Sequence, residues 1–589
     1  MRHSRSLRYI AGGLMIASEE IVEHLISRGF DCKAQDFNGA GAITVSLEIE
    51  KKKIELIHFL TSEITGLPVF FLMNPRDVGH LAHVLSFKAA DVEYGSICVN
   101  DKDSVSVNFN MPLLAIEESL NRHIGILNRA VTDPDWNRKE LLREFKSCWL
   151  NVCDFDERPV LFTNDGGALE EINVYRPVKN FKFGVRSYYL AQSQNSDLAA
   201  AAKVYWQDSS GRNLAGKAVV LPLTEIEPAP LEKEQLTTWY LAVLLKQEPD
   251  LLKKLRENYG RWKTQEYWIV FNAQVPSGTV WFCLYFKSKK GKQQSLPLTE
   301  AQLKHWKVKA VPIRLFNKEA VLPRGGANLD LATSKVALIG AGSVGSEIAH
   351  KLSAAGVQNL DIYDHDIYQI DNLYRHILPE EYLNLEKSYG LSYHLARQFL
   401  WSKAVPSKKK LLELRNSQLI SSYDLVVIAI GSPTHERLFK EYLLEKGIKV
   451  PVINTWLEGF GVGGHAVLDI PDSKGCLLCA YVCPDTLTRG LNSNLNFIEP
   501  NQDVTINMSG CGEQFISYSA ICSAQTALIA SDLAIKYLEG KITASSKVCW
   551  KGSEHEAVAH GVSLTNRFYQ FSDSLQIKPL IHEDCDVCN

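Results

Sequence analysis

The sequence predicts a multidomain protein of mixed α/β and α+β class, with an α+β N-terminal domain, a β-rich middle domain and a C-terminal α/β domain. Its 589 residues exceed the usual size of one domain and are enough for about three. A short apolar strand, a glycine-rich turn and a helix follow one another from residue 335, and strands and helices alternate beyond it. Two C-x-x-C pairs lie C-terminal to residue 475. The predicted domains are 1–165, 166–325 and 326–589.

The composition excludes several classes of protein. The 64 basic and 67 acidic residues give a net charge of −3, which offers no global field for nucleic acid or an anionic membrane. No run of about 18 uncharged apolar residues is present, and the N-terminal segment leads directly into an acidic amphipathic helix, which argues against a signal peptide. We therefore expect a cytoplasmic protein that binds neither nucleic acid nor membrane and keeps its 13 cysteines reduced.

The first domain is predicted to be α+β. An amphipathic helix is expected over residues 19–28, and apolar residues at helical spacing predict a second helix over 113–130. An irregular stretch before the second helix carries Cys98. The expected strands are 42–48, 54–60 and 68–72.

The middle domain is predicted to be β-rich, and we find no motif in it that carries chemistry. A helix over 233–246 interrupts the strands, and the basic run 287–292 is expected to be a solvated turn. The loop 323–326 leads into the last domain. The expected strands are 217–223, 267–272 and 279–286.

The last domain alternates apolar strands with helices, which predicts a mostly parallel sheet covered on both faces. The expected helices are 346–355 and 436–446. The expected strands are 336–339, 359–363, 425–430 and 450–454.

The motif Gly340-Ala-Gly342-Ser-Val-Gly345 lies between the first of these strands and its helix. Glycines permit a tight turn and a close approach of backbone to phosphate, and a helix N-terminus favours an anion. Asp364 ends the next strand, where it could bind a ribose hydroxyl. The motif predicts nucleotide binding, and the alternative is a turn that only packs strand against helix.

The residues after this acid favour ATP over NAD. Asn372 and Arg375 follow it closely, and an arginine there can neutralise a triphosphate and stabilise charge on a transferred group. Transfer of a hydride has no comparable need.

Together, the glycine turn, Asp364-His-Asp366 and Asn372-Leu-Tyr-Arg375 resemble the signature of the ubiquitin-activating and ThiF/MoeB superfamily over about residues 326–589. The resemblance implies a Rossmann-like adenylation domain that uses ATP with Mg²⁺ and acts as a homodimer. It also implies an arginine that reaches across from the partner protomer, for which Arg324 is our candidate.

Two positions depart from the family pattern. Lys387 lies at about the distance of the family's lysine, although Ser392 fits the following helix better. The family's aspartate after the third strand is replaced by Gly431-Ser432-Pro433, so the residue that holds Mg²⁺ is not identified by the resemblance.

The two C-x-x-C pairs, Cys476/Cys479 and Cys585/Cys588, can supply four thiolates to a tetrahedral Zn²⁺ ion. The same superfamily commonly fixes its C-terminal tail in this way. The alternative is two thiol pairs in turns that hold no metal.

Cys511 lies in a loop-like stretch before a helical run, where a thiol near a helix N-terminus can become a nucleophile. By resemblance to activating enzymes with an in-domain cysteine, it is our candidate for the thioester cysteine. Cys549 is the second choice.

The segment Tyr94-Gly-Ser-Ile-Cys98-Val resembles the sequence around the acceptor cysteine of ubiquitin-conjugating enzymes, over about residues 1–165. The H-P-N triplet of that family is absent, and His83-Val-Leu stands upstream instead. The alternative is a buried core cysteine on a strand.

The order of modules resembles the CD-NTase-associated protein 2 group of antiviral signalling systems. This resemblance implies a fused activating and conjugating enzyme, whose donor is a ubiquitin-like protein or the C-terminus of a CD-NTase and whose acceptor is an amine of a target protein. Two alternatives remain: an NAD-dependent oxidoreductase, which leaves Cys98 and Cys511 without a role, and a non-catalytic dimeric adapter with a degenerate nucleotide fold.

Overall fold

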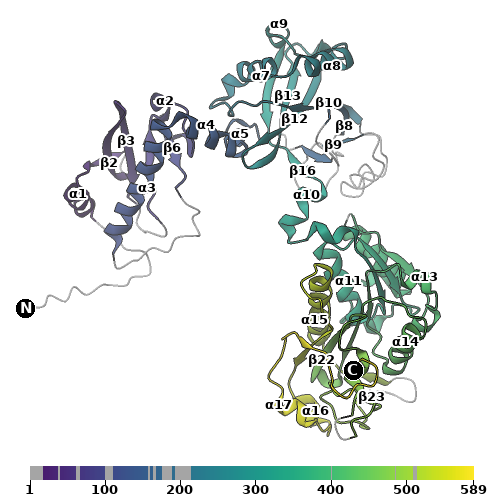
Figure 1. Cartoon of the computed structure of the whole chain (residues 1–589). Helices are drawn as coiled ribbons and strands as arrows, with labels where there is room; N and C mark the ends of the chain where they lie inside the picture. Colours follow the sequence, from purple (N-terminus) through teal and green to yellow (C-terminus); the bar gives the residue numbers. More distant parts are fainter. Residues whose placement is uncertain are drawn as a thin grey trace, which may run out of the picture. The chain divides into compact units, whose positions relative to one another are not determined.

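In the computed structural model the chain forms two compact units, Met1–Phe316 and Asn317–Asn589 (Figure 1). The structure describes residues 17–37, 40–60, 67–89, 91–99, 111–156, 159–162, 168–175, 189–192, 214–399, 401–483, 486–507 and 514–588. No helix within these ranges is long and apolar enough to cross a membrane.

The first unit begins with a six-stranded antiparallel sheet in the order β1-β2-β3-β4-β6-β5. Alternation along β2 and β3 places Ile43, Val45 and Leu56 on one face, where they pack against Ile116 and Leu120 of α3. The strands are β1 (Asp31–Phe37), β2 (Ala40–Ile49), β3 (Lys52–Phe59), β4 (Phe71–Met73), β5 (Val84–Ala89) and β6 (Val92–Ile97). The helices are α1 (Ser18–Ser27), α2 (Pro75–Val78) and α3 (Pro112–Thr132).

A second sheet follows in the same unit, in the order β15-β13-β12-β10-β8-β9-β7-β16. Its strands are β7 (Val160–Phe162), β8 (Glu170–Tyr175), β9 (Tyr189–Gln192), β10 (Leu214–Leu223), β12 (Glu266–Val275), β13 (Gly278–Ser288), β15 (Trp306–Val311) and β16 (Arg314–Phe316). The helices are α4 (Pro134–Arg143), α5 (Phe145–Val152), α7 (Leu236–Leu245), α8 (Pro249–Tyr259) and α9 (Glu300–Leu303), and a short ribbon pairs β11 (Lys263–Thr264) with β14 (Gln294–Ser295).

The helix α5 packs into the core of this second sheet, although it precedes the sheet in the chain. Phe145 and Trp149 lie against Phe282 of β13, with ring centroids 4.7 and 4.8 Å away, and all three belong to one buried cluster with Tyr240 of α7. The helix pair α4–α5 thus leads the chain from the first sheet into the core of the second.

The second unit contains an eight-stranded sheet in the order β19-β18-β17-β20-β21-β22-β25-β26. The first five strands are parallel neighbours, and the last three are antiparallel. The strands are β17 (Lys335–Ile339), β18 (Asn359–Tyr363), β19 (Val405–Ser407), β20 (Leu425–Ile428), β21 (Val452–Leu457), β22 (Gly463–Asp469), β25 (Ser546–Lys551) and β26 (Lys578–Pro579), and a separate ribbon pairs β23 (Thr505–Asn507) with β24 (Gln514–Ile516).

Helices cover both faces of this sheet, as the sequence predicts. Residues of α11, α12 and α15 form one buried cluster with Val336 and Leu338, whereas Phe439 and Leu443 of α14 pack against the opposite face with Ile339. The helices are α10 (Lys318–Val321), α11 (Ser343–Ala355), α12 (Lys387–Gln398), α13 (Ser417–Ile420), α14 (Pro433–Glu445), α15 (Ala520–Leu538), α16 (His555–Ala559) and α17 (Asn566–Gln570).

The structure corrects two predicted elements and adds a strand that the sequence does not predict. The stretch expected to be irregular before Cys98 contains the β5–β6 hairpin. The helix α11 begins at Ser343 rather than at residue 346, because Gly342 is its N-cap. β1 was not predicted, since most of its side chains are polar or exposed and it gives no apolar alternation.

Candidate functional site

The glycine turn joins β17 to α11 through two positions that admit no side chain. Gly340 has φ +96°, and a Cβ there would lie 2.6 Å from the carbonyl oxygen of Ala429. A Cβ on Gly345 would lie 1.9 Å from the oxygen of Gly340. Around Gly342, by contrast, no described heavy atom lies within 4 Å of the Cβ position. The first and third glycines therefore permit close packing, and the second leaves open space at the N-terminus of α11.

A cavity of about 290 Å³ lies at this helix N-terminus. Gly342, Asn372, Arg375 and Lys387 all line it, so the fold brings together four predicted nucleotide-binding residues from three separate segments. A helix N-terminus with two cationic side chains suits a polyphosphate. The other predicted residues of this region do not line the cavity: Gly340, Gly345, Asp364 and Arg324.

Asp364 is hydrogen-bonded to the glycine turn. Its Oδ2 atom accepts a hydrogen bond from the backbone N–H of Ala341 at 2.6 Å, and its Oδ1 accepts one from the N–H of Asp366 at 2.8 Å. Lys387 lies 3.0 Å from a carboxylate oxygen of Asp366, and only 12% of its side chain is exposed. The ligand atoms of Asp364, His365 and Asp366 lie within 4.8 Å of one another, and such carboxylate oxygens suit a hard cation.

Sequence reasoning did not find Tyr518, which also lines the cavity. Its hydroxyl lies 3.0 Å from the hydroxyl of Ser343, the first residue of α11. The guanidinium of Arg375 lies 5.2 Å from the centre of its ring, within the range of a cation–π contact. Tyr518 thus touches both the helix N-terminus and the arginine, and no sequence motif signals this contact.

His376 lies at the wall of the same cavity in its neutral form. Burial lowers its pKa to about 4. Its Nδ1 accepts the backbone N–H of Leu378 at 3.1 Å, and its Nε2 lies 2.7 Å from the carbonyl oxygen of Ala341, to which it must donate. The ring therefore fixes the glycine turn and is not a free base.

Of the two other predicted catalytic residues of this unit, the structure places one, Arg324, which does not line the cavity. Arg324 lies exposed in a short 3₁₀ turn, Pro323–Gly325. Cys511 lies outside the described residues, and the paired strands β23 and β24 stand on either side of the stretch that contains it.

Cys98 is exposed and directly follows β6. Its backbone N–H donates to the carbonyl oxygen of His83 at 2.8 Å. This placement differs from that of Cys32, Cys153 and Cys283, which are buried in cores as packing residues.

Cys549, the second choice for the thioester, lies in the sheet interior with 3% of its surface exposed. It stands opposite His465 in the pairing of β22 with β25, and Arg567 Nη2 lies 3.6 Å from its sulfur. A protein carboxylate could reach this thiol only if the sheet opened.

Glu458 completes a buried charged network with these side chains. Its Oε1 lies 2.6 Å from His465 Nε2, and its two oxygens accept the backbone N–H groups of Phe497 and Ile498 at 2.7 and 2.9 Å. Burial alone would lower the pKa of His465, but the neighbouring Cys549 and Glu458 raise it to about 9. The same histidine and Arg567 hold the pKa of Cys549 below its usual value despite burial.

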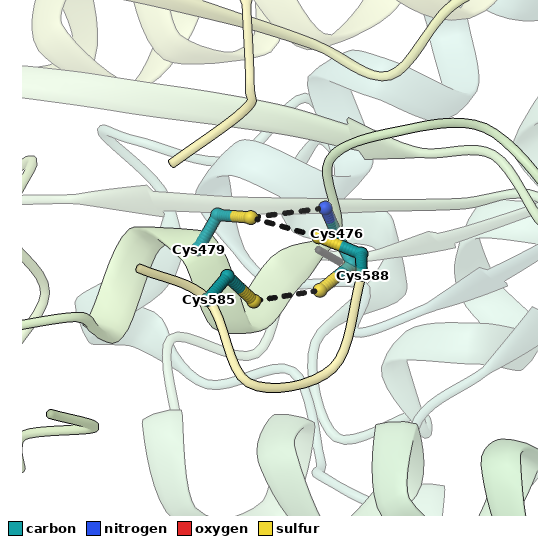
Figure 2. Close-up of side chains that lie close together, drawn as sticks. All are labelled: Cys476, Cys479, Cys585 and Cys588. Atoms are coloured by element: carbon teal, nitrogen blue, oxygen red, sulfur yellow. Dashed lines mark hydrogen bonds between the residues drawn. The ribbon is translucent and has the colours of Figure 1, made fainter. Parts of the chain in front are cut away.

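The four predicted zinc ligands converge from two distant segments (Figure 2). The sulfurs of Cys476 and Cys585 lie 3.8 Å apart, and those of Cys479 and Cys588 lie 3.4 Å apart. A tetrahedral zinc ion with Zn–S bonds of about 2.3 Å separates its sulfurs by about 3.8 Å. The hydrogen bond from Cys476 lowers the pKa of Cys479, and the same contact together with burial raises the pKa of Cys476. These donors fit a structural zinc site.

We expect purified protein to contain about one zinc ion per chain, and Cys585→Ser to weaken zinc binding at least about tenfold and lower the melting temperature, because metal binding contributes directly to folding. Metal analysis and calorimetry measure both quantities. Cys483→Ser is the matched control, since Cys483 lies near the first pair in sequence but outside the cluster. Wild-type protein without zinc, or equal zinc in Cys585→Ser, would contradict the assignment.

The C-terminal part of the chain matches a family model, and the chain is similar to several known proteins. Residues 317–574 match the model of the ThiF family. The ATP-dependent ubiquitin transferase-like protein Cap2 of Escherichia coli (strain TW11681) is 25% identical over 267 residues, which are 44% of this chain and 41% of that protein. Adenylyltransferase and sulfurtransferase MOCS3 of Sus scrofa is 32% identical over 114 residues, which are 19% of this chain and 25% of that protein.

Among solved structures, E. coli MccB with AMPCPP and selenomethionine MccA matches at 15% identity and a TM-score of 0.30, covering 44% of this chain and 68% of that chain. The chain spans less than half the length of the curated relatives named above.

Proposed function

We propose that this ThiF-type, Cap2-like protein is an ATP-dependent enzyme that activates the C-terminal carboxylate of a protein and conjugates it to an amine. The carboxylate attacks the α-phosphorus of ATP, which forms an acyl adenylate and releases pyrophosphate. The thiolate of Cys511 displaces AMP and forms a thioester. Cys98 accepts the acyl group by transthioesterification, Cys511 leaves as a thiolate, and a target amine then displaces Cys98 to form an amide.

The convergence of Gly342, Asn372, Arg375 and Lys387 on one cavity carries this proposal. A free helix N-terminus, an arginine and a lysine can bind a triphosphate and stabilise the charge that develops at the α-phosphate. The name of the Cap2 relative, a ubiquitin transferase-like protein, and that of the MOCS3 relative, an adenylyltransferase, favour this chemistry over hydride transfer.

ATP would enter this reaction with Mg²⁺, which neutralises phosphate charge. The carboxylates of Asp364 and Asp366 lie in the chain between the glycine turn and Asn372 and offer the oxygen ligands that Mg²⁺ prefers. Asp366 also pairs with Lys387, so this lysine and a cation would meet the same carboxylate.

The exposure of Cys98 supports its role as the acceptor thiol. We propose that the first sheet and its helices are a module similar to ubiquitin-conjugating enzymes. The donor would be a ubiquitin-like protein or the C-terminus of a CD-NTase, and the acceptor a lysine of a target protein. We further propose a homodimer in which the exposed Arg324 serves the cavity of a second copy.

The test is ATP–pyrophosphate exchange with a candidate donor, followed by non-reducing gels of the full chain. We expect wild type, Cys511→Ala and Cys98→Ala all to exchange pyrophosphate, because adenylation precedes both thioesters. The thiol-sensitive adduct should disappear in Cys511→Ala and accumulate on Cys511 in Cys98→Ala. Cys483→Ala is the control and should behave as wild type.

Each alternative has its own outcome. Exchange without any adduct would leave an adenylating enzyme and refute both cysteine assignments. Reduction of NAD in place of exchange would favour the oxidoreductase, and the absence of exchange with every donor would favour the adapter.

A further inference from the structure

The residue that accepts the backbone hydrogen bond of Cys98 has a conformation that needs support from other residues. The backbone N–H of Cys98 donates to the carbonyl oxygen of His83, so the position of the cysteine follows that of the histidine. His83 has φ +62°, a left-handed conformation that is unfavourable for a residue with a side chain. Contacts from elsewhere must therefore keep this residue in place.

Glu144 supplies two of these contacts. Its Oε1 lies 2.6 Å from His83 Nδ1, and its Oε2 accepts the backbone N–H of His83 at 3.0 Å. Glu140 faces the other ring nitrogen, with 3.6 Å between its Oε2 and His83 Nε2. The carboxylate of Glu144 thus binds both the backbone and the ring of His83, and the carboxylate of Glu140 lies near the other ring nitrogen.

Asn137 fixes the neighbouring residues in the same way. Its Oδ1 accepts the N–H of Ala82 at 2.7 Å, and its Nδ2 donates to the carbonyl oxygen of His80 at 2.8 Å. Because both ends of this amide are engaged with the backbone, we assign Asn137 to positioning the loop rather than to stabilising an oxyanion.

Asn137 lies on α4, and Glu144 lies at the junction of α4 with α5. Glu144 is the single residue between α4 and α5, and α5 also contacts β5, the strand that follows His83. Phe145 and Trp149 of α5 are fully or almost fully buried in the core of the second sheet. The helix that follows Glu144, the residue that holds His83, is therefore anchored in the core of the second sheet.

We propose that Glu144 and His83 form a clamp that positions Cys98 for acyl transfer and couples the position of this cysteine to the second sheet through α5. This inference deepens the proposed function, since it rests on Cys98 as the acceptor thiol. Glu144, His83 and Asn137 are positioning residues, and they take the place of the H-P-N triplet that the sequence lacks.

The charged groups around His83 define its titration. Glu140 and Glu144 face its two ring nitrogens, and Arg143 lies 3.5 Å from Glu140. The ring of Trp136 lies 5.9 Å from the imidazole, centre to centre, and the guanidinium of Arg129 lies over that tryptophan ring. The hydrogen bond with Glu144 is the largest cause that raises the pKa of His83, against the effect of burial. Burial would raise the pKa of Glu144, but its bonds with His83 lower it.

The two pKa shifts define the pH range over which His83 and Glu144 form an ion pair. Because the pKa of His83 is raised in the folded protein, its ion pair stabilises the fold fully at pH values below the pKa of the unfolded chain. This stabilisation is lost as the pH rises through the pKa of the folded protein. A lowered glutamate pKa gives stability that is lost as pH falls through its own folded value. The ion pair therefore loosens on the alkaline side once His83 releases its proton.

The test compares Glu144→Gln and His83→Gln with wild type in the full chain. We expect each variant to slow transfer from Cys511 to Cys98 about tenfold, as small misplacements of reacting groups do, with pyrophosphate exchange unchanged. The rate of Cys98 alkylation by iodoacetamide, measured by mass spectrometry against pH, should show a step from His83 in wild type. Glu144→Gln should move this step to lower pH, and His83→Gln should remove it.

Glu118→Gln is the control, because Glu118 forms an exposed ion pair with Arg122 on α3. Unchanged transfer and an unchanged alkylation profile in both variants would overturn the clamp. Absence of any thioester on wild-type Cys98 would instead refute the acceptor role, and the alkylation profiles would still report whether the clamp positions the cysteine.

Discussion

Replacement of Arg375 by alanine is expected to lower the rate of ATP–pyrophosphate exchange by about two to three orders of magnitude. Removal of one preorganised group that stabilises transition-state charge typically costs this much. Arg375 lines the cavity together with Asn372 and the open end of α11, and Tyr518 lies against its guanidinium. The exchange assay with a saturating donor measures the effect directly.

Arg397→Ala is the matched control for this prediction. Arg397 belongs to the same unit, is exposed and pairs with Glu381, so its loss should change exchange by less than about twofold. Arg375→Lys separates charge from shape, because lysine keeps the charge but loses the planar group. Normal exchange in Arg375→Ala would show that the cavity is not the site of adenylation.

The second large effect concerns stability. Glu458→Gln is expected to destabilise the C-terminal unit by about 3–5 kcal/mol, because it removes the carboxylate from a buried network and leaves charged partners behind. The glutamine keeps the volume but cannot neutralise His465, whose side chain is fully buried. For a domain of this size, calorimetry should show a melting temperature lower by about 10 °C.

The network also predicts a pH dependence. The pKa of His465 in the folded protein is about 9, above the usual pKa of a histidine. Its contribution to the free energy of unfolding is therefore fully present below that usual pKa and declines as the pH rises through about 9. Wild-type stability should fall over this alkaline range, and that of Glu458→Gln should change less.

Glu441→Gln is the control for both measurements, since Glu441 forms a surface ion pair with Arg489 in the same unit and should contribute less than about 1 kcal/mol. Equal stability of Glu458→Gln and Glu441→Gln would show that the buried network is not charged in the folded protein.

The parts of the site that could be predicted from sequence are those that lie close together in the chain. The turn from Gly340 to Gly345 follows a short apolar strand and opens a helix, so local pattern alone predicts the geometry in which the N-terminus of α11 faces a cavity. Asn372 and Arg375 both lie in the connection between β18 and α12. The two thiol pairs were predicted because C-x-x-C spacing is itself a local signal.

The contacts that could not be predicted join segments far apart in the chain. Glu458, His465 and Cys549 meet only because β22 pairs with β21 and β25, and none carries a recognisable spacing. Tyr518 reaches Ser343 across more than a hundred residues. Asp364, which is predicted to bind a ribose hydroxyl, also accepts the backbone N–H of Ala341, and no spacing in the sequence signals this contact.

The helix α5 also bears on how this protein can exchange parts with others during evolution or engineering. A cut near residue 165 would carry away Phe145 and Trp149, whose partners lie in the second sheet, and would leave an apolar helix without its core. A cut before α4 would remove Asn137 and Glu144 from the backbone of Ala82 and His83, which lies next to Cys98. The smallest part that can be inherited or transplanted intact is therefore the first sheet, which leads to Cys98, together with the second sheet.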